Sequence, residues 1–149
     1  MDENAYRNTF SAINQITCPF EKAVLSRRVD CEKLVRINIA EREAAGCSSL
    51  IAQGDCDGLL AHLRRSALFA LHLTHAEGVL PHAKEMKVQC GGLLGLQAQL
   101  FPASADAARV ENIYRLVQAA LERFGGVENI PYQEIVKAVS AFESRRPHR

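Results

Sequence analysis

The chain has 149 residues, a formal net charge of +1 and 48% hydrophobic residues, a composition typical of one soluble globular domain. No apolar segment approaches the ~20 residues that a membrane span requires, so we expect no membrane partner. The near-neutral charge excludes the strong basic field of most nucleic-acid-binding domains, so we expect no nucleic-acid partner either. The first residues, MDENAYRNTF, are acidic and polar, unlike a signal peptide, and we expect a cytoplasmic protein.

Apolar residues spaced three and four apart recur along most of the chain and predict helices. The first helix covers residues 6–16. A second begins at Pro19, and no glycine or proline interrupts the chain from there to Gly46. We expect this stretch to form one long helix, or two joined near Val29–Asp30, ending at Gly46. The segment LVRINIA, residues 34–40, alternates as a strand does and is the competing signal.

Glycine and proline divide the rest of the chain into further helical stretches. These are a helix from Asp55 or Asp57 to about His75, a segment 81–101 broken near Cys90, a helix 102–124 closed by Gly125–Gly126, and a final helix 129–142. We interpret Gly91, Gly92 and Gly95 as positions of close helix packing, because no strand precedes them and no phosphate-binding lysine accompanies them. The sequence therefore predicts an all-α fold, a single compact bundle of about six or seven helices. We expect one domain over residues 1–149, with 143–149 as a frayed basic tail.

Cysteine is the unusual feature of the composition. A reducing cytosol keeps thiols free, so five cysteines indicate packing, redox chemistry or metal binding rather than a disulfide framework. Most of them lie at the expected helix ends, where unpaired N–H groups and the helix dipole stabilise anionic sulfur. We therefore predict an iron–sulfur cluster, [4Fe–4S], as cofactor. The predicted ligands are Cys18, Cys31, Cys47 and Cys56, with Cys90 or His82 as possible substitutes.

One geometric objection accompanies this ligand set. If residues 32–45 formed one straight helix, its rise of ~1.5 Å per residue would hold Cys31 and Cys47 roughly 20 Å or more apart. Either the LVRINIA segment breaks the helix, or Cys31 is not a ligand. Zinc is a weaker alternative cofactor, because zinc sites usually place their ligands in close C-x2-4-C pairs and this chain has none. Five ordinary packed thiols are the remaining interpretation.

No nucleophile elbow, P-loop, H-E-x-x-H or dinucleotide-binding motif is present, so we do not expect a self-contained enzyme. The favoured hypothesis is a small cytoplasmic iron–sulfur protein for electron transfer or redox sensing, which docks on a protein partner or forms a homodimer. Two arginine pairs, Arg27–Arg28 and Arg64–Arg65, are candidates for steering that docking. The alternative is a cofactor-free helical adaptor or regulatory subunit that binds a protein through residues 104–143.

Overall fold

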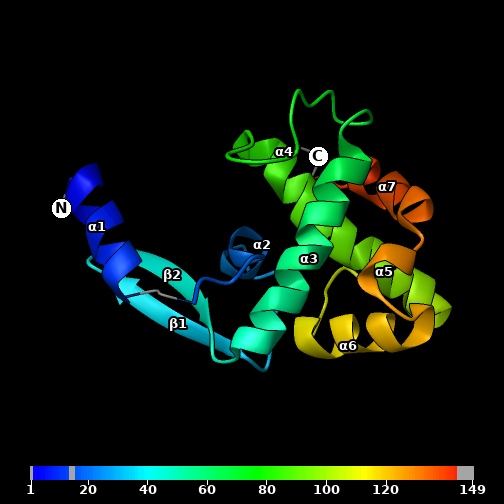
Figure 1. Ribbon diagram of the computed structural model, residues 1–149, viewed down its shortest axis with the longest axis horizontal. Coiled ribbons are helices and arrows are strands. Elements are labelled where there is room, and N and C mark those ends of the chain that lie inside the picture. The colour runs from blue at the N-terminus through cyan, green and yellow to red at the C-terminus, as the bar shows by residue number, and fades with distance from the viewer. Residues whose placement is uncertain (1, 14–15, 144–149) are drawn as a thin grey trace, which may run out of the picture.

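The computed structural model describes residues 2–13 and 16–143, which form packed helices with a two-stranded antiparallel sheet at one side (Figure 1). The predicted all-α bundle is therefore wrong: the fold is mixed α/β, although the number of helices agrees roughly with expectation. The expected tail at residues 143–149 lies, apart from Glu143, outside the described residues. None of the helices in the described part of the chain is long and apolar enough to cross a bilayer.

The elements follow one another with short connections, apart from an irregular stretch over residues 68–81. The helices are α1 (Glu3–Ile13), α2 (Glu21–Leu25), α3 (Leu50–Ala67), α4 (His82–Met86), α5 (Gly92–Leu100), α6 (Ile113–Phe124) and α7 (Tyr132–Ala141). The strands are β1 (Leu34–Ile39) and β2 (Arg42–Cys47). A π-helical segment, Lys87–Gly91, joins α4 to α5, and short 3-10 turns occupy Pro102–Ser104 and Val127–Asn129.

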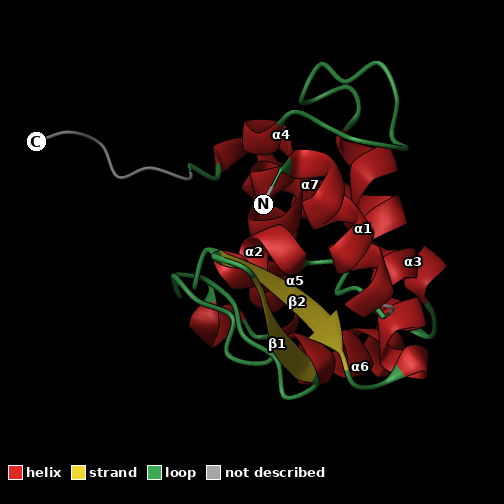
Figure 2. Cartoon of the chain, turned by 90° about the vertical axis from the view of Figure 1, so that its left-hand side faces the viewer, coloured by secondary structure: helices red, strands yellow, loops and turns green. Residues whose placement is uncertain are grey.

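The β-hairpin formed by β1 and β2 replaces the helix expected after Pro19 (Figure 2). Alternating β-branched residues in LVRINI favour a strand, and this local preference prevails over the absence of helix-breaking residues. The chain reverses after Ile39 with Ala40 in the left-handed region, at φ 55°. The register pairs Leu34 with Cys47 at the open end of the hairpin. Gly46 is consequently a strand residue and not the end of a helix.

Three helices also differ from the expected bounds. Helix α2 has only five residues, and the chain turns soon after it at Arg27, whose φ is 67°. Helix α3 begins at Leu50, ahead of the expected start at Asp55, because the Ser49 side chain accepts a hydrogen bond from the Ala52 N–H at 3.2 Å. Helix α6 begins only after the 3-10 turn that follows α5, so it is shorter than expected.

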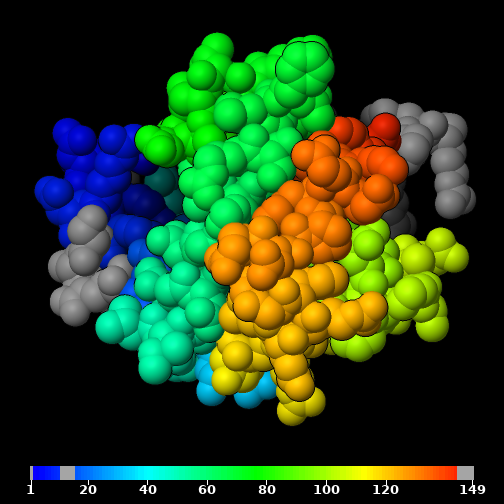
Figure 3. Space-filling view, turned by 45° about the vertical axis from the view of Figure 1, so that its right-hand side comes forward, coloured from blue at the N-terminus to red at the C-terminus, as the bar shows by residue number. Residues whose placement is uncertain are grey.

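The hydrophobic core lies between α3, α5, α6 and α7, and Figure 3 shows α3 and α7 side by side. The break expected near Cys90 is absent, because the π-helical segment continues the helix into α5. The expected close packing at the glycines is confirmed. A Cβ atom at Gly91 would lie 2.7 Å from the Val139 Cα and 2.9 Å from the Ala138 carbonyl oxygen.

We predict that Gly91→Ala lowers the free energy of unfolding by about 1–3 kcal/mol, because the added methyl group meets backbone atoms of α7. Gly58→Ala is the matched control: it also lies within a helix, but no atom lies within 4 Å of the added Cβ. That variant should gain up to about 1 kcal/mol from helix propensity. Urea denaturation of both variants measures the difference, and equal stabilities would contradict the close packing.

Candidate metal centre

Four cysteine side chains line one cavity between the hairpin, the start of α2, the first turns of α3 and the start of α6. They are Cys18, Cys31, Cys47 and Cys56, the same four residues that the sequence singles out. Each is a free thiol and is partly buried. They come from four separate segments of the chain, so the tertiary fold and not a local motif places them around this cavity.

The hairpin removes the geometric objection to this set. Because β1 and β2 run antiparallel, the chain that leaves Cys31 returns alongside itself and ends at Cys47, instead of running roughly 20 Å away along a helix. The edge of β2 that faces away from β1 binds the segment that contains Cys18. The Cys18 N–H donates to the Ala45 carbonyl at 3.0 Å, and the Cys47 N–H donates to the Ile16 carbonyl at 2.8 Å. One ladder of backbone hydrogen bonds therefore positions Cys18 and Cys47, and a turn closed by the Leu34 N–H on the Cys31 carbonyl at 3.2 Å holds Cys31 next to β1.

Three of these sulfurs each accept a hydrogen bond from the backbone N–H two residues further along the chain. The Lys33 N–H donates to the Cys31 Sγ, and the Ser49 N–H donates to the Cys47 Sγ, both at 3.5 Å. The corresponding amide for Cys18 is that of Phe20. A fourth donor, the Tyr114 N–H in the first turn of α6, also points to Cys31. Backbone N–H groups aimed at sulfur stabilise thiolate charge, as in iron–sulfur and other thiolate–metal sites.

When no metal is bound, burial disfavours the thiolate form that these donors favour. Loss of hydration raises the pKa of Cys18 to about 12 and also raises the pKa values of Cys31 and Cys56. Repulsion between the thiolates raises these pKa values further, because each would be charged beside the others. Without a metal, the thiols of Cys18, Cys31 and Cys56 are therefore protonated at neutral pH, and a metal would have to displace their protons.

The cavity is small and its walls are mainly apolar. Pro19, Leu34, Ala52 and Ile113 contribute to the lining, and the volume is about 20 Å³. That is room for little more than one water molecule. Within the described residues, no three Cys, His, Asp or Glu side chains stand close enough, as placed, to hold a metal ion. The thiols line a common space without forming a coordination shell.

The two possible substitute ligands lie elsewhere. Cys90 is fully buried in the hydrophobic core between the helices. His82 lies at an exposed hollow on α4, where its Nδ1 is 3.2 Å from the Lys22 Nζ. Sequence reasoning missed Lys33 and Tyr114, which line the cavity together with the cysteines. No local pattern marks these two residues, because the hairpin register and the docking of α6 bring them there.

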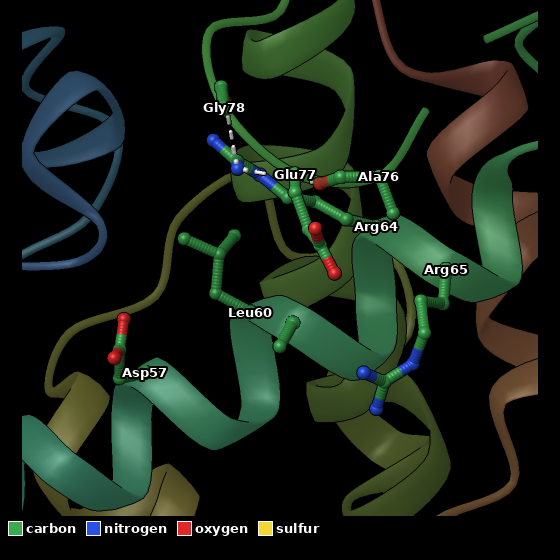
Figure 4. A pocket seen from close by; sticks show the side chains of 8 residues that line it. Asp57, Leu60, Arg64, Arg65, Ala76, Glu77 and Gly78 are labelled. Carbon is green, nitrogen blue, oxygen red and sulfur yellow. Dashed lines mark hydrogen bonds between the residues drawn. The ribbon is translucent and has the colours of Figure 1, made fainter. Parts of the chain in front are cut away.

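A different hollow, of about 230 Å³, lies between α3 and the irregular stretch that follows it (Figure 4). Arg64 crosses it: its Nη1 donates to the Ala76 and Gly78 carbonyls, and its Nη2 lies 2.8 Å from the Glu85 Oε1. The Glu85 side chain is 4% exposed. Figure 4 shows Arg65 pointing away from this network. Arg64 therefore stabilises the fold and is not placed to steer a partner.

We predict that Arg64→Met lowers the free energy of unfolding by about 3–5 kcal/mol, because it leaves the buried Glu85 carboxylate without its positive partner. The exposed neighbour supplies the control, since Arg65→Met should change stability by no more than about 0.5 kcal/mol. Chemical denaturation of both variants gives the comparison. A similar small effect for both would show that the Arg64 ion pair contributes little to stability.

The raised thiol pKa values predict how stability depends on pH. Because a folded thiol such as Cys18 titrates near 12 and an unfolded cysteine near 8.5, the folded state keeps protons that the unfolded state loses. Stability of the metal-free protein should therefore fall as the pH rises above about 8.5. A Cys18→Ser/Cys56→Ser variant should lose less stability between pH 8 and pH 10, measured by urea denaturation. Parallel losses in both proteins would contradict this.

Comparisons of the chain with known protein families, with curated proteins and with solved structures find no match. Any proposal about the chemistry of this cavity is therefore argued from the residues that line it.

Proposed function

We propose that this protein holds a [4Fe–4S] cluster on Cys18, Cys31, Cys47 and Cys56 and serves in electron transfer or redox sensing. The observation that carries the proposal is the convergence of four thiols from four separate segments on one cavity. Backbone N–H donors already directed at three of the sulfurs support it. Such donors disperse the negative charge that a cluster and its four thiolates share.

A cluster and a single zinc ion would place the four sulfurs at different distances from one another. Four thiolates around one zinc, with bonds of about 2.3 Å, lie only about 3.8 Å from one another. In a four-iron cluster each thiolate binds a different iron, so the sulfurs stand farther apart. As placed, the described Cys, His, Asp and Glu side chains form no group of three close enough for a single ion, so the sulfurs would have to rearrange for either cofactor. The reconstitution below distinguishes the two by the metal and sulfide that bind.

The ligand set also favours electron transfer or sensing over catalysis on a substrate. Four thiolates occupy all four irons of a [4Fe–4S] cluster and leave no open coordination position. All four cysteines are only partly buried, so a cluster here would lie close enough to the surface to exchange electrons with a docked protein partner. A reducing cytoplasm is the compartment in which such free thiols persist.

We predict that anaerobic reconstitution with iron and sulfide gives a brown protein with about four irons and four sulfides per chain. This protein should absorb at about 400 nm. Serine at any one of the four cavity cysteines should reduce the bound iron by at least about half, because a ligand is lost. Cys90→Ala is the matched control and should load fully, because Cys90 lies in the core and not at the cavity. Elemental and sulfide analysis measures the outcome.

A colourless wild-type protein without iron or acid-labile sulfide would overturn the proposal. Zinc bound at one equivalent per chain, without sulfide, would assign the four thiols to a different metal. If neither metal binds, the cofactor-free adaptor becomes the better interpretation of the helical half of the molecule.

A further inference from the structure

Lys33 is the one charged side chain among the described residues that line the cavity. Its ammonium group lies 4.8 Å from the centre of the Tyr114 ring, in a cation–π contact. Both residues are partly buried. The ammonium thus lies against an aromatic ring of α6 that itself lines the cavity.

The backbone of Lys33 is fixed from two sides. Its N–H donates to the Cys31 Sγ at 3.5 Å, and its carbonyl accepts a hydrogen bond from the Ser48 N–H at 2.8 Å. The first contact joins Lys33 to the turn that holds Cys31, and the second joins it to the residue after Cys47. The hairpin therefore fixes the Lys33 backbone relative to two of the sulfurs, and the contact with the Tyr114 ring places its ammonium.

The other charges near these sulfurs are negative. Glu21 interacts electrostatically with Cys18, Asp55 with Cys56, and Glu32 with Cys31. The cluster with its four thiolates would itself carry net negative charge, and reduction adds one electron to it. In a mainly apolar cavity such interactions are weakly screened. A fixed positive charge here stabilises the reduced state more than the oxidised state.

We infer that Lys33 is the residue that raises the reduction potential of this site, and that Lys33 and Tyr114 together cover Cys31 from solvent. This inference deepens the proposed function and rests on it. Lys33 acts as a positioning and charge-bearing residue beside the cofactor, and Tyr114 keeps its ammonium in place. No covalent chemistry at either residue is involved.

The test is a redox titration of reconstituted protein carrying Lys33→Met, Lys33→Glu or Lys33→Arg. Loss of the charge should lower the equilibrium constant for reduction about tenfold, which is about 59 mV for a one-electron couple. Lys33→Glu should lower the potential further, and Lys33→Arg should keep it near the wild-type value. Lys137→Met is the matched control, because Lys137 lies on the exposed surface of α7 and pairs with Glu134. It should leave the potential unchanged.

A second measurement uses the metal-free protein and follows alkylation of Cys31 by mass spectrometry. Tyr114→Ala should speed labelling several-fold, whereas Tyr114→Phe, which keeps the ring, should label at the wild-type rate. Equal rates in both variants would overturn the covering role, and unchanged potentials across the Lys33 series would overturn the charge role. Iron and sulfide contents are measured first: an unloaded wild type removes the proposed function, whereas full loading with unchanged potentials removes only this inference.

Discussion

The reversal of the chain between β1 and β2 is the constraint on which the rest of the cavity depends. This reversal places Cys47 opposite Leu34, and the outer edge of β2 binds the segment of Cys18 through backbone hydrogen bonds. An isolated two-stranded hairpin is marginally stable in water. Here the Glu21 carboxylate accepts the Ala45 N–H at 2.8 Å and ties α2 to β2. The hairpin is therefore stable only as part of the same arrangement that brings the sulfurs together.

Two opposing electrostatic effects meet at these sulfurs. Burial penalises thiolates, which is why the pKa of Cys18 rises to about 12, whereas amide N–H groups at Cys31 and Cys47 favour negative charge. Without metal the first effect prevails and protons neutralise the site. Bound metal would replace those protons, and the amide donors would then act on anionic sulfur without the cost of bare buried charge. The amide donors around these sulfurs thus favour anionic sulfur, whereas the burial of the same sulfurs disfavours it.

The cysteines show how far sequence reasoning reaches. The argument from helix starts holds for Cys18, which precedes α2. Cys47, expected just after a helix, instead ends β2, Cys56 lies inside α3 and Cys31 precedes a strand. Residues 34–47 carry two competing signals, strand-like alternation and the absence of helix-breaking residues, and the alternation prevails in the hairpin. Helices α6 and α7 were predictable in outline, since their apolar spacing is regular and Gly125 ends α6 at φ 80°.

The two sides of the cavity differ in how firmly they are held. Cys56 belongs to α3, whose Leu59 and Leu63 are buried in the main core, so its backbone can shift only if core packing is disturbed. Cys47 ends β2, and Cys31 lies three residues before β1, the other strand of a two-stranded sheet whose outward residues, such as Val35, remain exposed. A cavity of about 20 Å³ must widen to admit any inorganic cofactor. Since one wall is anchored in the core, that widening falls on the hairpin, where hydrogen bonds at the strand edge can adjust at lower cost than packed side chains.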